Sequence, residues 1–326
     1  MKTQKGAALL MAMLTVALVA TLASAALWQQ WRQVEIETAE RGRSQTAWMM
    51  TGALDWSRLI LREDANSAQA AGVDHLGEPW ALPVQESKLS SFLSQDQQWL
   101  EGDAEVFLSG QITDAQSRLN VRNLIEDGQI DPTAWAAWRR LFERLNLPLA
   151  ELQTLSRQLV LALPSQNMAQ ANGNMQAPVA LVPQRTAQLV WLGLSPTTLS
   201  ALENFITVLP EPTTVNLNTA PAEVLMACVP GLDLASARQL VALRERAHWA
   251  SLDAARQVFG PASRSLDDKR HGIRSNYFEI TGRMRIDQVV QQERALVKRE
   301  GKQVRMLWRA RAPLAVPPIG HSPTLQ

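Results

Sequence analysis

The sequence predicts an α+β protein in which one long N-terminal helix packs on a small antiparallel sheet and a large all-α domain is inserted in that sheet. Two observations predict this architecture, and a general property of insertions supports it. An apolar run near the start continues into a proline-free amphipathic segment. Strand-like residues occur once before and three times after a large block of helical patterns. A helical block is tolerated within a sheet where its two ends leave the host close together.

The first element is a helix that begins with the apolar run 7–27. These 21 residues carry no charge. A helix of this length spans about 30 Å, the thickness of one hydrocarbon core. Lys2 and Lys5 precede the run, so its basic end is expected to stay in the cytoplasm. Residues 28–63 contain no proline and mix apolar with charged side chains, which predicts an amphipathic, half-buried continuation of the transmembrane helix.

Three interpretations of this start stay open on the residues alone. Ala23-Ser24-Ala25 fits the cleavage site of a secretory signal peptide. The apolar run also fits an uncleaved anchor. The junction Gly6-Ala7 fits a third interpretation, a leader of the type IV pilin kind that is cut after Gly6. The helical continuation over 28–63 favours this third interpretation, because a loop normally follows a signal peptide.

The strands are expected in four segments, and the chain divides around them. The segments are Glu105–Thr113, Tyr277–Ile286, Val289–Lys298 and Gln303–Ala310, with a hairpin turn at Arg299–Lys302. The expected divisions are a sheet domain from 64–113 and 276–311, an inserted helical domain over 114–275, and a disordered tail over 312–326. Residues 64–103 are expected to be mostly loop. The window 269–311 holds twelve basic and four acidic residues, which we interpret as a solvated sheet face.

Composition narrows the classes of function. The formal net charge is +1, whereas a dedicated nucleic-acid binder is usually clearly basic. One cysteine, Cys228, excludes an intramolecular disulfide and a multi-cysteine metal cluster. The sequence shows no zinc-hydrolase, Walker A or G-x-S-x-G motif. We therefore expect no enzyme, no catalytic residue, no cofactor and no metal site.

The most specific internal motif is Val215–Leu225, in which Thr219 is expected to cap a helix with Pro221 in its first turn. A turn and a second helix follow, and Ser251 is expected to open a third. Residues 215–259 resemble helix-hairpin-helix modules, which grip DNA phosphates with backbone N–H groups. An acid, Asp233, stands here where the second hairpin glycine would be, and it would repel phosphate. We expect a structural relic or a protein-contact unit; the alternative is a membrane-tethered DNA-binding protein.

Short segments in a fixed order give the whole chain a resemblance to one family. These segments are the Gly6-Ala7 junction, Gln45–Trp48 with Gly52-Ala53, Asp74–Glu78, Ile112–Asp114 with Arg118–Val121, Val215–Leu225 and Ser275–Ile280. The chain resembles the minor pseudopilin K family of the type II secretion system. The resemblance implies a pilin-like fold with a helical domain inserted in the sheet. It also implies a non-enzymatic subunit at the tip of the pseudopilus that initiates assembly and supports protein export.

The resemblance also implies how the chain is processed and what it contacts. Prepilin peptidase would cut after Gly6, and Ala7 would be N-methylated. The chain would sit in the inner membrane with a periplasmic body, beside minor pseudopilins of the I and J type, and would touch exported substrates but no nucleic acid. The fifth residue after the cut is Met11, where most pilin-like subunits carry a glutamate. A carboxylate in lipid needs a cationic partner, such as a neighbour's N-terminus, so Met11 marks a tip position with no such neighbour.

One departure from the family concerns calcium. Family members that bind calcium have an Asp-rich loop in the helical domain, and the corresponding region here, 155–192, contains no Asp or Glu. Because carboxylates supply most of the affinity for Ca²⁺, we expect this site to be missing. The nearest acids, Glu126, Asp127 and Asp131, are expected to mark a solvated turn and the start of a helix.

Overall fold

A computed structural model describes residues 5–66, 72–88, 106–163, 181–286 and 289–312. The polar loop 165–177, most of the expected loop after residue 88 and the tail from 313 lie outside these ranges. Residues 1–53 form one compact unit and the rest of the chain a second. Helix α1 (Lys5–Asn66) begins in the first unit and ends in the second, three residues after the expected end of the amphipathic segment.

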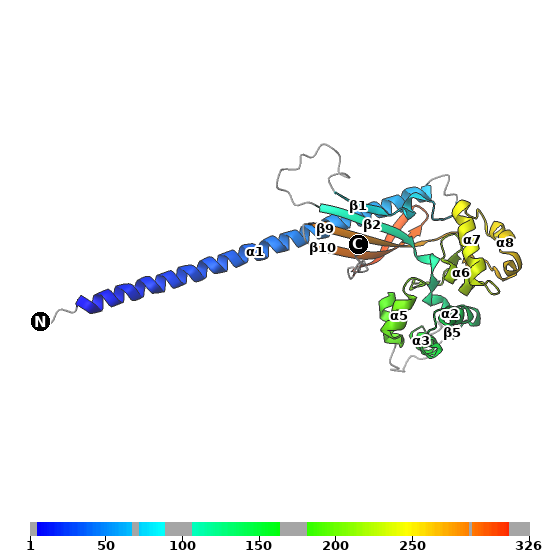
Figure 1. Ribbon diagram of the computed structural model, residues 1–326, viewed down its shortest axis with the longest axis horizontal. Helices are drawn as coiled ribbons and strands as arrows, with labels where there is room; N and C mark the ends of the chain where they lie inside the picture. Colours follow the sequence, from blue (N-terminus) through cyan, green and yellow to red (C-terminus); the bar gives the residue numbers. More distant parts are fainter. Residues whose placement is uncertain (1–4, 67–71, 89–105, 164–180, 287–288, 313–326) are drawn as a thin grey trace, which may run out of the picture. The chain divides into compact units, whose positions relative to one another are not determined.

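The second unit contains a five-stranded antiparallel sheet with the order β1-β2-β9-β10-β11 (Figure 1). Its strands are β1 (Val84–Lys88), β2 (Val106–Asp114), β9 (Tyr277–Ile286), β10 (Val289–Glu300) and β11 (Gln303–Arg311). Strands β2 and β9 are neighbours although more than 160 residues separate them, and Asp114 pairs with Phe278. The chain therefore leaves and re-enters the sheet at adjacent positions. This confirms the predicted α+β fold with an inserted helical domain.

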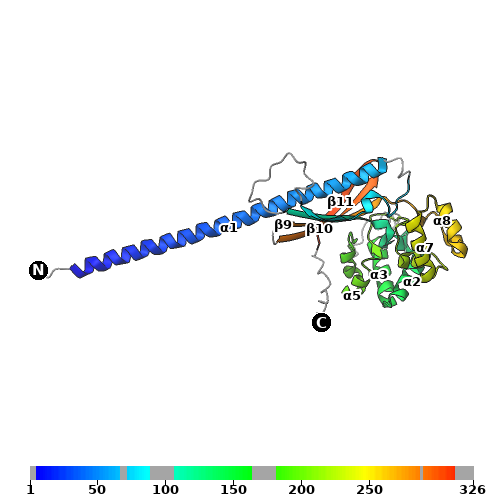
Figure 2. The same ribbon diagram turned by 45° about the horizontal axis from the view of Figure 1, so that its top comes forward.

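The last turns of α1 pack on one face of this sheet (Figure 2). Leu54 and Leu61 are two helical turns apart and so lie on the same side of the helix. They share a core with Phe278, Ala295 and Val297. Alternate strand residues point to opposite faces, so this apolar set covers the α1 side and leaves the intervening side chains for the other side.

The inserted domain is mainly helical and has a core of its own. Its helices are α2 (Pro132–Arg144), α3 (Leu149–Ala162), α5 (Pro196–Leu202), α6 (Ala222–Cys228), α7 (Leu234–Arg246) and α8 (Leu252–Val258), with 3-10 turns at Thr186–Leu192 and Gly260–Ser265. Two-residue strand pairs tie its segments together: β3 (Leu119–Asn120) with β6 (Ile206–Thr207), β4 (Ile125–Glu126) with β5 (Gln129–Ile130), and β7 (Val215–Asn216) with β8 (His271–Gly272). Trp138 and Phe142 lie buried in the core on one face of α2, one helical turn apart.

Several local predictions are confirmed and three are wrong. Asp131 and Ser251 cap α2 and α8 as expected. The loop expected over 64–103 contains strand β1, which the sequence analysis missed. The hairpin turn is shorter than expected, because β10 continues to Glu300 and only Gly301-Lys302 turn, with Gly301 at a φ of +56° that glycine adopts without steric cost. Thr219 does not cap α6: Pro221 stands at the N-cap, and the Thr219 hydroxyl bonds elsewhere.

The packing of α1 predicts different effects of two neighbouring leucines. Leu61→Ala removes a fully buried side chain and should lower the free energy of unfolding by about 2–5 kcal/mol. Leu59→Ala, on the same helix, changes a side chain that is 45% exposed and should cost less than about 1 kcal/mol. Chemical denaturation of the purified chain, followed by near-ultraviolet circular dichroism, measures both. Equal losses would contradict the packing described here.

Candidate functional site

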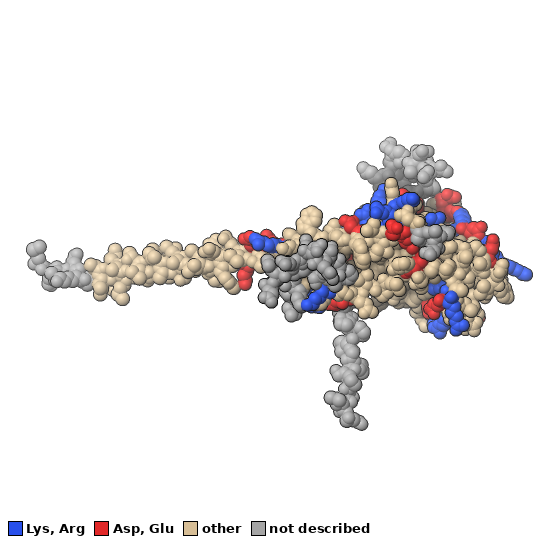
Figure 3. All heavy atoms as spheres, turned by 90° about the horizontal axis from the view of Figure 1, so that it is seen from above, with Lys and Arg blue, Asp and Glu red and all other residues tan. Residues whose placement is uncertain are grey.

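The residues predicted for processing lie at the start of α1. Gly6 and Ala7 lie within the first turns of this helix, and Met11, one turn further, is 66% exposed. From Ala8 onward α1 is long and apolar enough to cross a membrane, and the apolar side chains of its first part are exposed. Figure 3 shows this part of the helix without charged side chains. An exposed apolar helix of this length fits a transmembrane anchor.

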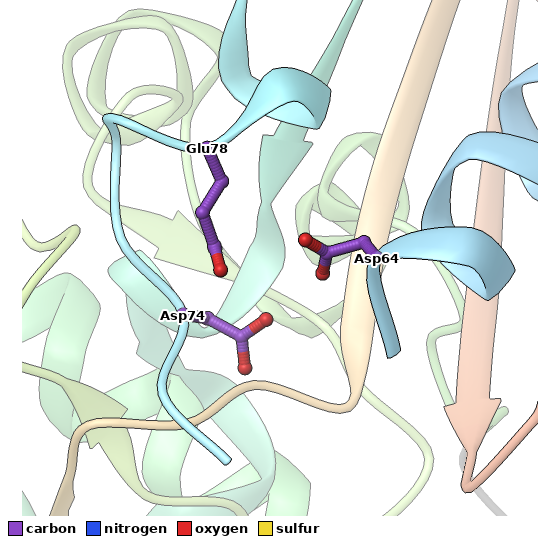
Figure 4. A group of neighbouring side chains, drawn as sticks. All are labelled: Asp64, Asp74 and Glu78. Atoms are coloured by element: carbon purple, nitrogen blue, oxygen red, sulfur yellow. The ribbon is translucent and has the colours of Figure 1, made fainter. Parts of the chain in front are cut away.

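A second candidate site is a cluster of three buried carboxylates in the second unit. Asp64 lies near the end of α1, and Asp74 and Glu78 lie in the loop that precedes β1 (Figure 4). The three groups have oxygen atoms within 4.8 Å of one another. Such a group needs positive charge or N–H donors, because a buried carboxylate without a partner is costly.

Arg299 of β10 supplies that positive charge. Its Nη1 donates to Asp64 Oδ2 at 2.8 Å, and its Nη2 donates to Asp74 Oδ1. Nη2 also donates to the Ser275 carbonyl at 2.9 Å, and the guanidinium lies 4.7 Å from the centre of the Phe278 ring. One buried arginine thus connects α1, the loop before β1, and the strands that carry the sheet core.

Asp114, the last residue of β2, extends the network into the inserted domain. Its Oδ2 accepts hydrogen bonds from Ser275 Oγ at 2.6 Å and from Thr219 Oγ1 at 2.5 Å. Asn216 Nδ2 donates to the same oxygen at 3.0 Å. The Ser275 backbone N–H donates to Asp74 Oδ2 at 2.8 Å, which closes the connection to the carboxylate cluster. We call these residues together with Asp64, Glu78 and Arg299 the polar junction.

Burial raises the pKa of three acids of the polar junction, Glu78, Asp114 and Asp64. Desolvation raises the pKa of Glu78 to about 7, although the His75 backbone N–H and the Trp80 indole N–H donate to its carboxylate. Desolvation also raises the pKa of Asp114 to about 6, against the hydrogen bonds from Ser275 and Thr219. For Asp64, burial outweighs the attraction of Arg299, and its pKa is raised.

The geometry of the polar junction fits a structural role. Carboxylate oxygens this close together can bind a cation, but two of the three carboxylates already bind the Arg299 guanidinium. The third, Glu78, accepts two N–H bonds from its own loop. The arrangement therefore holds together α1, the sheet and the insert. The expected lack of a calcium site over 155–192 stays a prediction, since residues 164–180 lie outside the described ranges.

In the turn of the helix-hairpin-helix-like segment, an acid stands at the position where the second glycine of a DNA-binding hairpin would be. Asp233 caps α7, and its Oδ1 accepts the Ser236 backbone N–H at 2.8 Å. This bond lowers the pKa of Asp233, so a negative charge stays at the amino end of the helix. The Asp233 carboxylate thus already accepts the hydrogen bond of the Ser236 backbone N–H, which a DNA phosphate would need as a donor.

Sequence reasoning missed Asp64 and Arg299 and misjudged the basic strands. The window 269–311 was expected to be a solvated face, but Arg299 is buried. Three other arginines pair with acids: Arg285 with Glu86, Arg294 with Glu279, and Arg309 with Glu293. An excess of basic residues over acids in that window was the only available signal, because the acids that bind Arg299 are more than 200 residues away in the chain.

An exposed apolar helix whose last turns pack on an antiparallel sheet with an inserted helical domain is a pilin-like fold. Two family descriptions, both for type II secretion system (T2SS) protein K, match residues 117–211 and 215–274. Over these two segments the chain is similar to the T2SS protein K family. This similarity supports a role as a minor pseudopilin in protein secretion.

Three relatives named T2SS protein K align with most of the chain. The protein from Pseudomonas aeruginosa is 26% identical over 85% of this chain and 83% of its own length. That from Pectobacterium carotovorum is 24% identical and covers 94% and 96%, respectively. That from Klebsiella pneumoniae is 26% identical and covers 92% and 94%.

The fold has a counterpart among solved structures. The GspK-GspI-GspJ complex from the enterotoxigenic Escherichia coli type 2 secretion system contains a chain that superposes with a TM-score of 0.61. The match covers 84% of this chain and 98% of that chain at 15% sequence identity. This similarity shows the shared fold.

The role of Arg299 predicts a large loss on its removal. Arg299→Gln leaves two buried carboxylates without their cation and should lower the free energy of unfolding by about 3–5 kcal/mol. Lys302→Gln removes one positive charge from the exposed turn nearby and should change the free energy of unfolding by less than about 0.5 kcal/mol. Adding Asp64→Asn to Arg299→Gln should restore part of the loss. Additive losses in the double variant would contradict the pairing.

The raised pKa of Glu78 predicts that the stability of the protein depends on pH. Its pKa is about 7 in the folded chain against an ordinary 4.5, so between these values the folded state binds more protons than the unfolded one. The free energy of unfolding therefore falls as pH rises from about 5 to 8, by at most roughly 3 kcal/mol from this group. Glu78→Gln keeps an acceptor for Trp80 and should flatten the slope. Glu63→Gln, on an exposed site of α1, is the control. An unchanged slope in Glu78→Gln would disprove the assignment.

Proposed function

We propose that this protein is a minor pseudopilin that sits at the tip of the T2SS pseudopilus, initiates its assembly and supports export across the outer membrane. The observation that carries the proposal is α1 itself: its first part exposes an apolar surface, and its last turns belong to a folded body. Such a helix can be held in the inner membrane and can pack with the helices of other subunits.

The orientation follows from the charges beside the helix. Lys2 and Lys5 lie on the amino side of the apolar run, and the positive-inside rule keeps them in the cytoplasm. The body after α1 then lies in the periplasm. Cleavage after Gly6 and methylation of Ala7 would give the mature chain.

The partners proposed are minor pseudopilins of the I and J type. The solved complex with the similar fold contains GspK together with GspI and GspJ, which supports this choice. The inserted domain accounts for about half the chain, and its bulk supports a place at the end of a filament rather than within it. Met11 supports the same place, because a terminal subunit has no neighbouring N-terminus for a glutamate to neutralise.

The role proposed is assembly without catalysis. The polar junction binds its acids to protein donors and an arginine, which supports a structural purpose for them. Cys228 is buried, and desolvation raises its pKa to about 12, so its thiol is a poor nucleophile. Contact with exported substrates would use the body of the protein.

The start of the mature chain tests the proposal. Mass spectrometry of the protein from membranes should find a chain that begins at Ala7 and carries one added methyl group. Gly6→Val adds a branched side chain at the cut and should leave the chain beginning at Met1, which serves as the control. A wild-type chain that begins at Ala26 would mean release by signal peptidase, and one that begins at Met1 would mean an uncut anchor. Either result would overturn the pseudopilin proposal.

A further inference from the structure

A groove of about 600 Å³ lies between the inserted domain and the face of the sheet that points away from α1. On β10, Ala295 and Val297 pack towards α1, so Leu296 between them points to the other face. The apolar lining of the groove comes from both sides. The insert contributes Val121, Leu159 and Leu209, and the sheet contributes Leu296, Leu307 and Trp308. The groove is thus a hydrophobic floor shared by the two parts of the second unit.

Three hydrogen-bond donors around this floor have no acceptor among the described residues. The indole Nε1 of Trp308 is buried and unbonded. Arg122 and Arg305 line the groove, and among the described residues no hydrogen bond of their guanidinium groups is seen, although Arg305 lies near enough to Glu300 to lower the pKa of that carboxyl group. Burial lowers the pKa of Arg122, so its charge is already partly removed from water.

The other charged groups of the groove are already paired. Lys298 binds Glu211 at 2.9 Å and Glu300 at 2.6 Å, and Tyr277 donates its hydroxyl proton to Glu211 at 2.5 Å. The groove therefore offers unused donors and positive charge. A ligand that completes it must bring apolar groups for the floor and anionic acceptors for the donors.

The edge of the sheet does not offer a simple strand addition beside the groove. Arg58 of α1 donates from Nε and Nη2 to the Val304 carbonyl at 3.0 and 2.7 Å, which occupies an acceptor of β11. The pairing of β10 with β11 shifts at Leu307, and such a bulge twists an edge away from further pairing. Recognition at this place therefore depends on side chains in the groove rather than on the strand backbone.

We propose that this groove binds an extended segment of another protein in which acidic side chains alternate with apolar ones. Apolar side chains of the segment would fill the floor, and its carboxylates would accept hydrogen bonds from Arg122, Arg305 and the Trp308 indole. The charge complementarity of the unpaired donors carries this assignment. It holds whether or not the protein caps a pseudopilus.

Binding of matched peptides to the full chain in detergent micelles tests the proposal. The probe is a short, end-blocked, fluorescently labelled peptide of alternating leucine and glutamate, and its twin has glutamine in place of glutamate. Fluorescence anisotropy should show that the glutamate peptide binds at least about 10-fold more tightly than the twin. Arg122→Gln should weaken its binding about 10-fold, and Trp308→Phe, which removes the donor but keeps an aromatic ring, several-fold.

The control variant is Arg283→Gln. Arg283 lies exposed on the same face of the sheet but does not line the groove, so this change should leave the affinity within about two-fold. The proposal is overturned if the glutamate peptide does not bind, if Arg122→Gln binds it as the wild type does, or if Arg283→Gln loses as much as Arg122→Gln. Binding that is seen only after removal of residues 313–326 would show that the chain's own tail fills the groove, which also overturns it.

Discussion

The ion pairs of Arg299 with Asp64 and Asp74 are the interaction on which the rest of the structure depends. They join the end of α1, the loop after it and strand β10 at one buried point. Asp74 also receives the Ser275 backbone N–H, and Ser275 binds Asp114, so the same point holds both ends of the inserted domain. A buried charge network is costly unless every member is satisfied. The two parts of the second unit are therefore fixed by polar geometry where their separate hydrophobic cores meet.

The sequence predicts the elements that depend on local patterns better than the contacts between residues far apart in the chain. Strands β2 and β9 to β11 have local periodicity, and their segments were predicted within a few residues. Strand β1 was not, because Val84–Lys88 is mostly polar and becomes a strand only by pairing with β2. The short segments that gave the family resemblance include Asp74, Asp114, Asn216 and Ser275, and the structure brings all four together. The order of these segments along the chain does not predict that the four residues lie together in the fold. Arg299 and Asp64 lie outside the segments altogether.

The same residues explain how a helical domain and a pilin-like sheet are joined in this chain. The turn that would bind phosphate in a DNA-binding module is closed by Asp233, and Thr219 and Asn216 of the adjacent motif bond to Asp114 of the sheet. The helix-hairpin-helix-like segment thus serves as an internal connection of the protein. Asn216 and Thr219 of this segment form hydrogen bonds with the sheet. Contacts with other molecules are therefore left to the outer surfaces of the insert and to the groove beside β11.

The adjacent ends of the insertion have a mechanical consequence. The insert begins after Asp114 and ends before Tyr277, and these two strand ends are direct neighbours in the sheet. A pull along α1 passes from the helix into the sheet strands through the Leu54–Leu61 core and the Arg299 ion pairs. Both ends of the insert join the sheet at this one pair of neighbouring strand ends, so the helical domain is attached beside the path from α1 into the sheet.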